Sequence, residues 1–122
     1  MRDHVRSLAP EEACGLVAGV DGKSTQVLPV ENKLHSPVRF RMEPNQQIKA
    51  YLSILDQGLE LVAIYHSHPA GPDHPSLTDI EEAAYPEAAS LIWFRSGLIW
   101  SCRGYTIHDK HVDEIEIKLQ LE

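Results

Sequence analysis

The positions of apolar residues along the chain predict a sheet built largely from hairpins. Two pairs of apolar segments flank glycine-containing turns, an arrangement typical of antiparallel strands joined by a tight connection. The pairs are 14–20 with 24–30 around Asp21-Gly22, and 90–94 with 98–103 around Ser96-Gly97. Between the hairpins, the near-continuous apolar run 59–65 indicates a central strand that is covered on both faces.

Three stretches of the chain predict helices. The clearest begins at Pro44, where apolar residues recur with the spacing i, i+3, i+4 and i+7, and Gly58 is suited to end it. The apolar residues are Ile48, Tyr51, Leu52 and Leu55. A short helix is expected before Pro10, and another after the capping residue Ser76, with Pro86 as its stop.

Two further segments are expected to form strands. Residues 38–42 lie after the first hairpin, and the tail alternates apolar with charged or polar residues, which is the strand period of two. The apolar tail residues are Ile115, Ile117, Leu119 and Leu121. The predicted fold class is α+β, a mixed β-sheet flanked by helices. One domain over 1–122 is expected, because 122 residues are too few for two separate cores.

Composition and charge exclude several classes of protein. The formal charge of −7 argues against nucleic acid as a partner, since phosphate binding needs a clustered excess of Lys and Arg. The apolar runs are far shorter than the roughly 20 residues of a membrane span, so no membrane segment is expected. The N-terminus lacks a secretory pattern, which favours a cytoplasmic location. Cys14 and Cys102, the two cysteines, are too few for a disulfide framework or a Cys-x-x-Cys zinc site, and both are expected to be buried thiols.

A histidine pair follows the predicted central strand directly. In an extended chain, the side chains of His66 and His68 point the same way and can reach one ion. Zinc accepts imidazole and carboxylate ligands, and a catalytic zinc keeps three protein ligands and one open position. Asp79 can supply the third, because the intervening loop is rich in proline and glycine and its restricted conformations favour one placement. The hydroxyl of Ser76, three residues before Asp79, could also face such a site.

These residues resemble the signature of the JAMM (MPN-plus) metalloproteases. The motif reads His66-x-His68-Pro69 and, after six residues, Ser76-x-x-Asp79. The upstream segment 11–16 also resembles the family's segment that carries a catalytic glutamate. Alignment on Cys14-Gly15 places this glutamate at Glu12, with Glu11 as the neighbour that could be mistaken for it.

The resemblance implies a fold, a cofactor and a role for each residue. The fold would be the JAMM/MPN fold, which is cytidine-deaminase-like. The cofactor would be Zn²⁺, bound by His66, His68 and Asp79. Glu12 would take the proton from the zinc's water and return it to the leaving amine, while Ser76 would steady the tetrahedral intermediate.

The resemblance also implies a substrate. Bacterial relatives process ubiquitin-like or sulfur-carrier proteins, so we expect hydrolysis of a peptide or isopeptide bond after a C-terminal Gly-Gly. The sequence leaves open whether a tail is trimmed or an isopeptide bond is cut. It is compatible with a homodimer.

Two other functions compete with this hypothesis. A non-catalytic MPN-type scaffold module is disfavoured, because such domains typically lack one or more of the ligands that are present here. A zinc nucleoside deaminase needs His-x-Glu and Pro-Cys-x-x-Cys, and neither string occurs. Taken alone, a pair of loop histidines is more often solvated than ligating, and Glu12 would be a surface carboxylate. Their combination favours the metal site.

Overall fold

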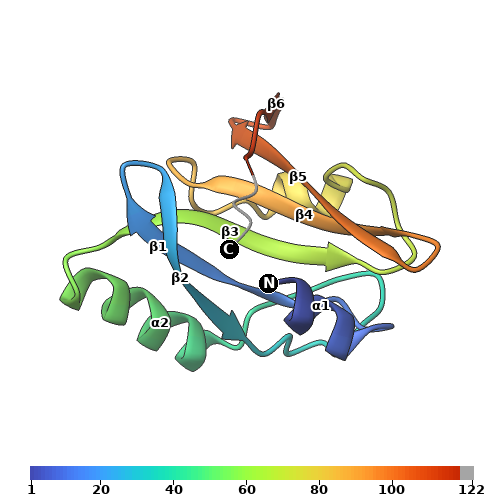
Figure 1. The fold of residues 1–122 in the computed structure, drawn as a ribbon, viewed down its shortest axis with the longest axis horizontal. Helices are drawn as coiled ribbons and strands as arrows, with labels where there is room; N and C mark the ends of the chain where they lie inside the picture. Colours follow the sequence, from blue (N-terminus) through green and yellow to red (C-terminus); the bar gives the residue numbers. More distant parts are fainter. Residues whose placement is uncertain (119–122) are drawn as a thin grey trace.

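The computed structural model describes residues 1–118, whose strands form one mixed sheet of six (Figure 1). In chain order the elements are α1 (Arg2–Leu8), β1 (Cys14–Val20), β2 (Lys23–Val30), α2 (Pro44–Asp56), β3 (Glu60–His68), α3 (Leu77–Glu81), β4 (Ala89–Ser96), β5 (Ile99–His108) and β6 (His111–Ile115). Across the sheet the order is β2-β1-β3-β4-β5-β6, with β3 and β4 parallel and the other neighbours antiparallel. The predicted α+β class and mixed sheet are confirmed.

Both predicted hairpins are present. In the turn between β1 and β2, Asp21 and Gly22 have positive φ angles of 53° and 75°, which match the twist of the strands that they join. In the turn between β4 and β5, Gly97 has a φ of 63°. The residue types that permit a positive φ therefore stand where each chain reversal needs it.

The parallel pair β3 and β4 places the loop and helix that follow β3 over one face of the sheet. A parallel pair cannot be joined by a tight turn, so the chain must leave the end of β3 and return to the start of β4. Residues 69–88, including α3, make this crossover. The crossover thus delivers its own side chains to the carboxyl end of β3.

Apolar side chains form a core on each face of the sheet. On one face, Val5 of α1 packs with residues of β1, β3, β4 and β5, among them the buried Trp93 and Trp100. On the other face, Ile54 of α2 packs against Cys14, Leu16 and other residues of β1 and β2. Both tryptophans, which flank the Ser96-Gly97 turn, therefore contribute to the core.

Gly15 and Tyr65 form a close cross-strand pair between β1 and β3. They are directly paired in the register, and Tyr65 is fully buried. A Cβ atom on Gly15 would lie 2.5 Å from the Tyr65 ring, which shows that the ring covers the glycine backbone. The Tyr65 hydroxyl also reaches His4 of α1, with Nδ1 2.7 Å away. This pair therefore anchors α1 to the strand that carries the two histidines.

Two of the predicted strands differ in the structure. Residues 38–42 form no strand among the described residues and contribute only an isolated bridge between Asn32 and Met42. In the tail, β6 ends at Ile115, before Ile117, while Leu119 and Leu121 lie outside the described residues. The strand forms earlier because its backbone pairs with β5 over 104–108, next to a tight turn at 109–110.

Helix α2 is confirmed, but three of its four periodic apolar residues lie outside the buried face, and only Tyr51 is partly buried against the core. Ile48, Leu52 and Leu55 are 57%, 57% and 53% exposed, whereas Ile54 is completely buried. Glu43 precedes the helix and caps it, since its side chain accepts from the Gln46 amide, and the helix ends before Gly58, which has a φ of 70°. Helical periodicity thus predicted the helix correctly but only a small part of the side that it buries.

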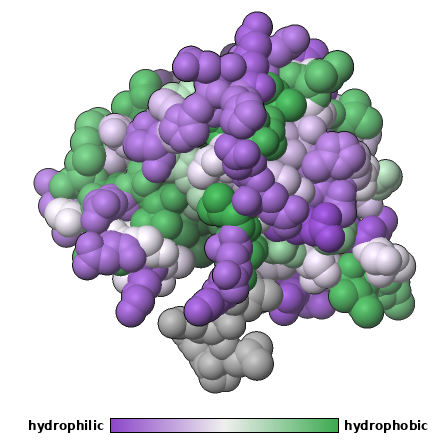
Figure 2. Space-filling model, turned by 90° about the horizontal axis from the view of Figure 1, so that it is seen from above, coloured by the Kyte–Doolittle hydropathy of each residue, from purple (hydrophilic) through white to green (hydrophobic). Residues whose placement is uncertain are grey.

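The outer surface of the described residues is mixed in polarity. In Figure 2, green hydrophobic atoms are interspersed with purple hydrophilic atoms on the face that is seen from above. None of the helices within residues 1–118 is long and apolar enough to cross a membrane.

The Gly15–Tyr65 contact predicts the effect of a small substitution. Gly15→Ala should destabilise the protein by about 1–3 kcal/mol, because the new methyl group overlaps the buried Tyr65 ring. Urea denaturation measures this cost. In a Tyr65→Leu background the same substitution should cost less, because the overlapping ring atoms are gone; an equal cost in both backgrounds would contradict the steric explanation.

Candidate metal centre

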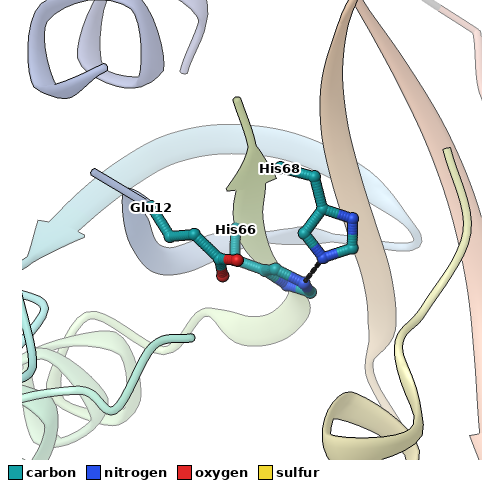
Figure 3. A group of neighbouring side chains, drawn as sticks. All are labelled: Glu12, His66 and His68. Carbon is teal, nitrogen blue, oxygen red and sulfur yellow. Dashed lines mark hydrogen bonds between the residues drawn. The ribbon is translucent and has the colours of Figure 1, made fainter. Parts of the chain in front are cut away.

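Strand β3 carries both histidines on one face of the sheet. The strand stays extended through His68, so the two residues are part of it rather than of the following loop. Each is only 4% exposed, and their Nε2 atoms lie 3.1 Å apart (Figure 3). The shared orientation expected from the i, i+2 spacing is therefore present.

Asp79 completes a triangle of potential ligand atoms. Its Oδ2 lies 3.1 Å from the Nε2 atom of His66 and 3.1 Å from that of His68. With ligand bonds of about 2.0–2.1 Å, a tetrahedral zinc ion requires its ligand atoms to be about 3.3 Å apart. The three residues therefore fit a tetrahedral ion with one position left open.

Helix α3 holds Asp79 through a capping box with Ser76. The Ser76 hydroxyl accepts from the Asp79 amide at 3.0 Å, and the Ser76 amide donates to Asp79 Oδ2 at 2.9 Å. A serine hydroxyl can accept and donate at the same time. The cap therefore leaves the hydroxyl proton of Ser76 free to donate to another group.

Glu12 precedes β1 and extends its carboxylate toward the histidine pair (Figure 3). It is 3% exposed, and its Oε1 atom has no hydrogen-bond partner among the described residues. One carboxylate oxygen lies within 4.8 Å of ligand nitrogens of His66 and His68. An isolated buried carboxylate oxygen is costly, so this orphaned atom points to a missing partner at the centre of the group.

Two buried polar residues, to which the sequence assigned no role, hold the backbone around Glu12. Ser67, between the two histidines, points to the opposite face, where its hydroxyl accepts from the Ala13 amide at 2.8 Å. The Asn32 side chain donates to the Glu12 carbonyl at 3.0 Å. Their role could have been inferred from one rule, which is that a polar side chain within a buried segment must find a hydrogen-bond partner.

Asn32 also connects Glu12 to the segment that follows β2. Its amide group donates to the Arg39 carbonyl at 3.0 Å, and its oxygen accepts from the amides of Leu34 and Arg41, each at 3.1 Å. Both N–H groups of the Asn32 side chain and both lone pairs of its oxygen are thus used. One buried side chain consequently fixes the loop 33–42 against the backbone of Glu12.

The environment of the site shifts the pKa values of Glu12, His66 and Asp79 in different directions. Burial raises the pKa of Glu12 to about 8, although the charge of His68 acts in the opposite direction. Burial also lowers the pKa of His66, which favours the neutral imidazole that binds metals. For Asp79, burial opposes ionisation, but hydrogen bonds from both histidines outweigh it and hold the pKa well below its usual range.

The pKa of His68 moves in the other direction from that of His66. Burial lowers it, but the hydrogen bonds to Asp79 and to the Pro72 carbonyl, together with nearby negative charge, raise it overall. A histidine pair that faces one carboxylate can thus hold a proton where a metal ion would otherwise sit.

Several other residues that could titrate, ligate or act as nucleophiles lie outside this cluster. Glu11 is paired with His35 at 3.3 Å on the surface, and His74 is exposed beside Asp73. Cys14 is buried, and burial raises the pKa of its thiol to about 12, which does not suit a nucleophile. Cys102 has its pKa raised to about 12 for the same reason.

A cavity of about 460 Å³ adjoins the cluster on the side of His66 and Asp79. Phe40 forms part of its wall and stacks on the His66 ring, with centroids 4.5 Å apart. Other lining residues come from α2, from the crossover after α3, and from β3, β4 and β5. Most of this wall is apolar, as is common in sites that take part of a ligand.

The chain matches the family described as prokaryotic homologs of the JAB domain over residues 1–106. A CysO-cysteine peptidase of Mycobacterium tuberculosis is 35% identical over 114 residues, which cover 91% of this chain and 78% of that protein. A desampylase of Pyrococcus furiosus is 39% identical over 63% of this chain and 55% of its own length. A probable TtuB-protein conjugate cleaving protease of Thermus thermophilus is 41% identical over 69% of this chain and 57% of its own length.

Solved structures agree with the fold. Protein DSY2949 from Desulfitobacterium hafniense has a TM-score of 0.84 at 35% identity, covering 98% of this chain and 86% of that one. The JAB1/MPN domain protein AF2198 from Archaeoglobus fulgidus shares the fold with a TM-score of 0.57 at 17% identity, covering 95% and 86%. The expected JAMM-type peptidase is confirmed at the level of family by relatives that are named peptidases and proteases. The chain therefore belongs to the prokaryotic homologs of the JAB domain, a family of the JAMM/MPN type.

Proposed function

We propose that this chain is a zinc-dependent peptidase that cleaves after the C-terminal Gly-Gly of a ubiquitin-like or sulfur-carrier protein. The observation that carries the proposal is the triangle of ligand atoms from His66, His68 and Asp79, with 3.1 Å sides, beside the orphaned carboxylate oxygen of Glu12. Imidazole and carboxylate donors with an open fourth position are typical of catalytic zinc.

The distances support different roles for Glu12 and Asp79. Asp79 lies 3.1 Å from both histidine nitrogens and would be the third ligand, while Glu12 would remain outside the ligand set. When bound, zinc supplies Lewis acidity that polarises a carbonyl and lowers the pKa of water. The Glu12 carboxylate would accept the proton of the attacking water and pass it to the leaving amine.

Ser76 would stabilise the oxygen of the reacting carbonyl. Its hydroxyl proton is not used by the capping box, so it can donate to an oxygen on which negative charge develops. Because the hydroxyl is held at the start of α3, it need not reorganise when the charge appears.

The proposed substrate draws on the relatives and on the shape of the site. The relatives are named for CysO-cysteine, for desampylation and for TtuB conjugates, and this chain would act on a carrier protein of that kind. The histidines are 4% exposed, so a scissile carbonyl must approach with little side-chain bulk beside it. Glycine meets that requirement, since it has no side chain.

The same proposal covers the extent of the domain, its cellular compartment and the charge of its substrate. Residues 1–122 would act as one catalytic domain, and the two free thiols suit a reducing cytoplasm. The net charge of −7 would favour a carrier with a basic face, through attraction that weakens as salt rises.

The ligand assignment predicts the metal content of variants. The parent protein should bind about one zinc per chain, whereas His68→Ala and Asp79→Ala should lose more than the roughly 10–100-fold in affinity that loss of an outer partner costs. Elemental analysis after gel filtration measures the content. His74→Ala is the matched control, because it removes an exposed histidine of the same loop and should keep the zinc. Full zinc in Asp79→Ala would remove Asp79 from the ligand set.

The raised pKa of Glu12 predicts how the metal-free protein responds to pH. The folded state holds this proton up to about pH 8, whereas the unfolded state releases it near the ordinary value of 4.5. Between those values the unfolded state binds fewer protons, so stability falls as pH rises. Glu12→Gln should lack this component, which urea denaturation of both chelator-treated proteins from acid to weakly alkaline pH can measure. Parallel stability curves for the two proteins would show that burial does not perturb Glu12.

The substrate assignment predicts selective cleavage of a tail-extended carrier. A ubiquitin-fold protein extended beyond Gly-Gly should be cut after the second glycine, and bulky replacements of the glycines should block the reaction. Glu12→Gln should lower the rate by roughly 10²–10⁴-fold, while Glu11→Gln, the matched control, should keep it. Product mass and rate are the measurements. Equal cleavage of glycine and bulky tails would reject the substrate, and an inactive Glu11→Gln beside an active Glu12→Gln would reject the base.

A further inference from the structure

The loop between β3 and α3 is fastened to the sheet at a point next to a candidate metal ligand. This loop, 69–76, leaves the end of β3 and passes β5 before it reaches α3 (Figure 1). Within it, the carbonyl of Pro72 accepts a hydrogen bond from Nδ1 of His68 at 2.8 Å. A proton on Nδ1 leaves Nε2 with its lone pair, and Nε2 is the atom that faces His66 and Asp79.

The residue after Pro72 is held by two side chains of β5. The Tyr105 hydroxyl donates to the Asp73 carbonyl at 2.6 Å, and Nη1 of Arg103 lies 2.6 Å from Asp73 Oδ2. These two bonds restrain both the backbone and the side chain of Asp73. The Pro72 carbonyl that contacts His68 is one peptide unit away.

The register of the sheet explains why β5 can reach this loop. His66 pairs with Ile92, and Ile92 pairs with Arg103, so the three lie in one row across β3, β4 and β5. Residues in such a row point to the same face, and Tyr105 is on that face because it lies two positions from Arg103. Both donors therefore stand on the side of the sheet that carries the metal-site histidines.

The two donors differ in their surroundings. Tyr105 is 5% exposed, so packing holds its side chain in place, and the bond from its hydroxyl to the Asp73 carbonyl is partly shielded from water. The Arg103 side chain is 46% exposed, but Asp73, Glu114 and the ring of Phe94 all contact it. Arg103 alone would be a weak surface ion pair, and Tyr105 is the stronger restraint.

We infer that Tyr105 and Arg103 are positioning residues for His68: by fixing Asp73 they hold the Pro72 carbonyl against Nδ1 and so set the tautomer and orientation of the ligating ring. The inference rests on the proposed function only in taking His68 to be a zinc ligand. Partners of metal-binding imidazoles typically change metal affinity 10–100-fold when they are lost. A partner one step further out should act at the low end of that range.

The experiment compares two Tyr→Phe variants that each delete one buried hydroxyl. Tyr105→Phe removes the bond to the loop, whereas Tyr65→Phe removes the bond to His4 on the opposite face of the sheet. Zinc affinity is measured by competition with a chromophoric chelator. The His68 tautomer is read from imidazole ¹⁵N NMR of the metal-free protein at alkaline pH, and thermal unfolding reports stability.

Tyr105→Phe should weaken zinc binding about tenfold and give a mixture of His68 tautomers. Tyr65→Phe should lower stability but leave zinc affinity and tautomer as in the parent. Arg103→Met, at an exposed position that does not endanger folding, should reproduce a smaller part of the effect, and Arg103→Lys should restore it by keeping a cation beside Asp73.

If Tyr105→Phe and Arg103→Met both keep the parent's zinc affinity and a pure Nδ1–H tautomer, the inference is overturned and the contacts merely tether a loop. If the parent protein itself binds no zinc, the proposed function fails. The tautomer comparison still decides the inference in that case, because it needs no metal.

Discussion

The site depends on one constraint, which is that β3 remains a regular strand through His68. Alternate residues of a strand point to opposite faces, so His66 and His68 share a face only while this geometry continues. Pairing with β1 on one side and β4 on the other fixes the register up to these residues. A slip of one residue would carry both imidazoles to the opposite face, where Tyr65 and Ser67 now lie.

The same alternation gives the opposite face of β3 a separate task. Tyr65 packs over Gly15 and bonds to His4, while Ser67 exchanges hydrogen bonds with Ala13. These contacts fix α1 and the residues next to Glu12, which then extends toward the histidines. One strand thus orients the two histidines with one face and the backbone next to Glu12 with the other.

The parts that were predictable from the sequence are those with short-range causes. The hairpin at Asp21-Gly22, the helix from Pro44, the Ser76 cap and the common face of the histidine pair each follow from residues within a few positions of one another. Asp79 entered the hypothesis through the composition of the loop before it, and the motif added Glu12 through resemblance. The failures have long-range causes. Exposure of the α2 stripe, the bridge that replaces a strand at 38–42, and the contacts of Asn32 and Tyr105 depend on which distant segments meet, and spacing along the chain does not encode that.

Among the residues of the site, Asp79 has the weakest apolar support, because α3 has five residues and none of them is buried. An isolated helix of that length is unstable in water, since it completes hardly more than one turn. Its position must therefore come from polar contacts: the capping box, the bonds to the two histidines, and the loop fastened at Asp73. An ion that joined Asp79 to β3 would add to the same set of restraints. Metal binding and the ordering of α3 are for this reason expected to be coupled, whereas the backbone of the histidine pair is already held by the sheet.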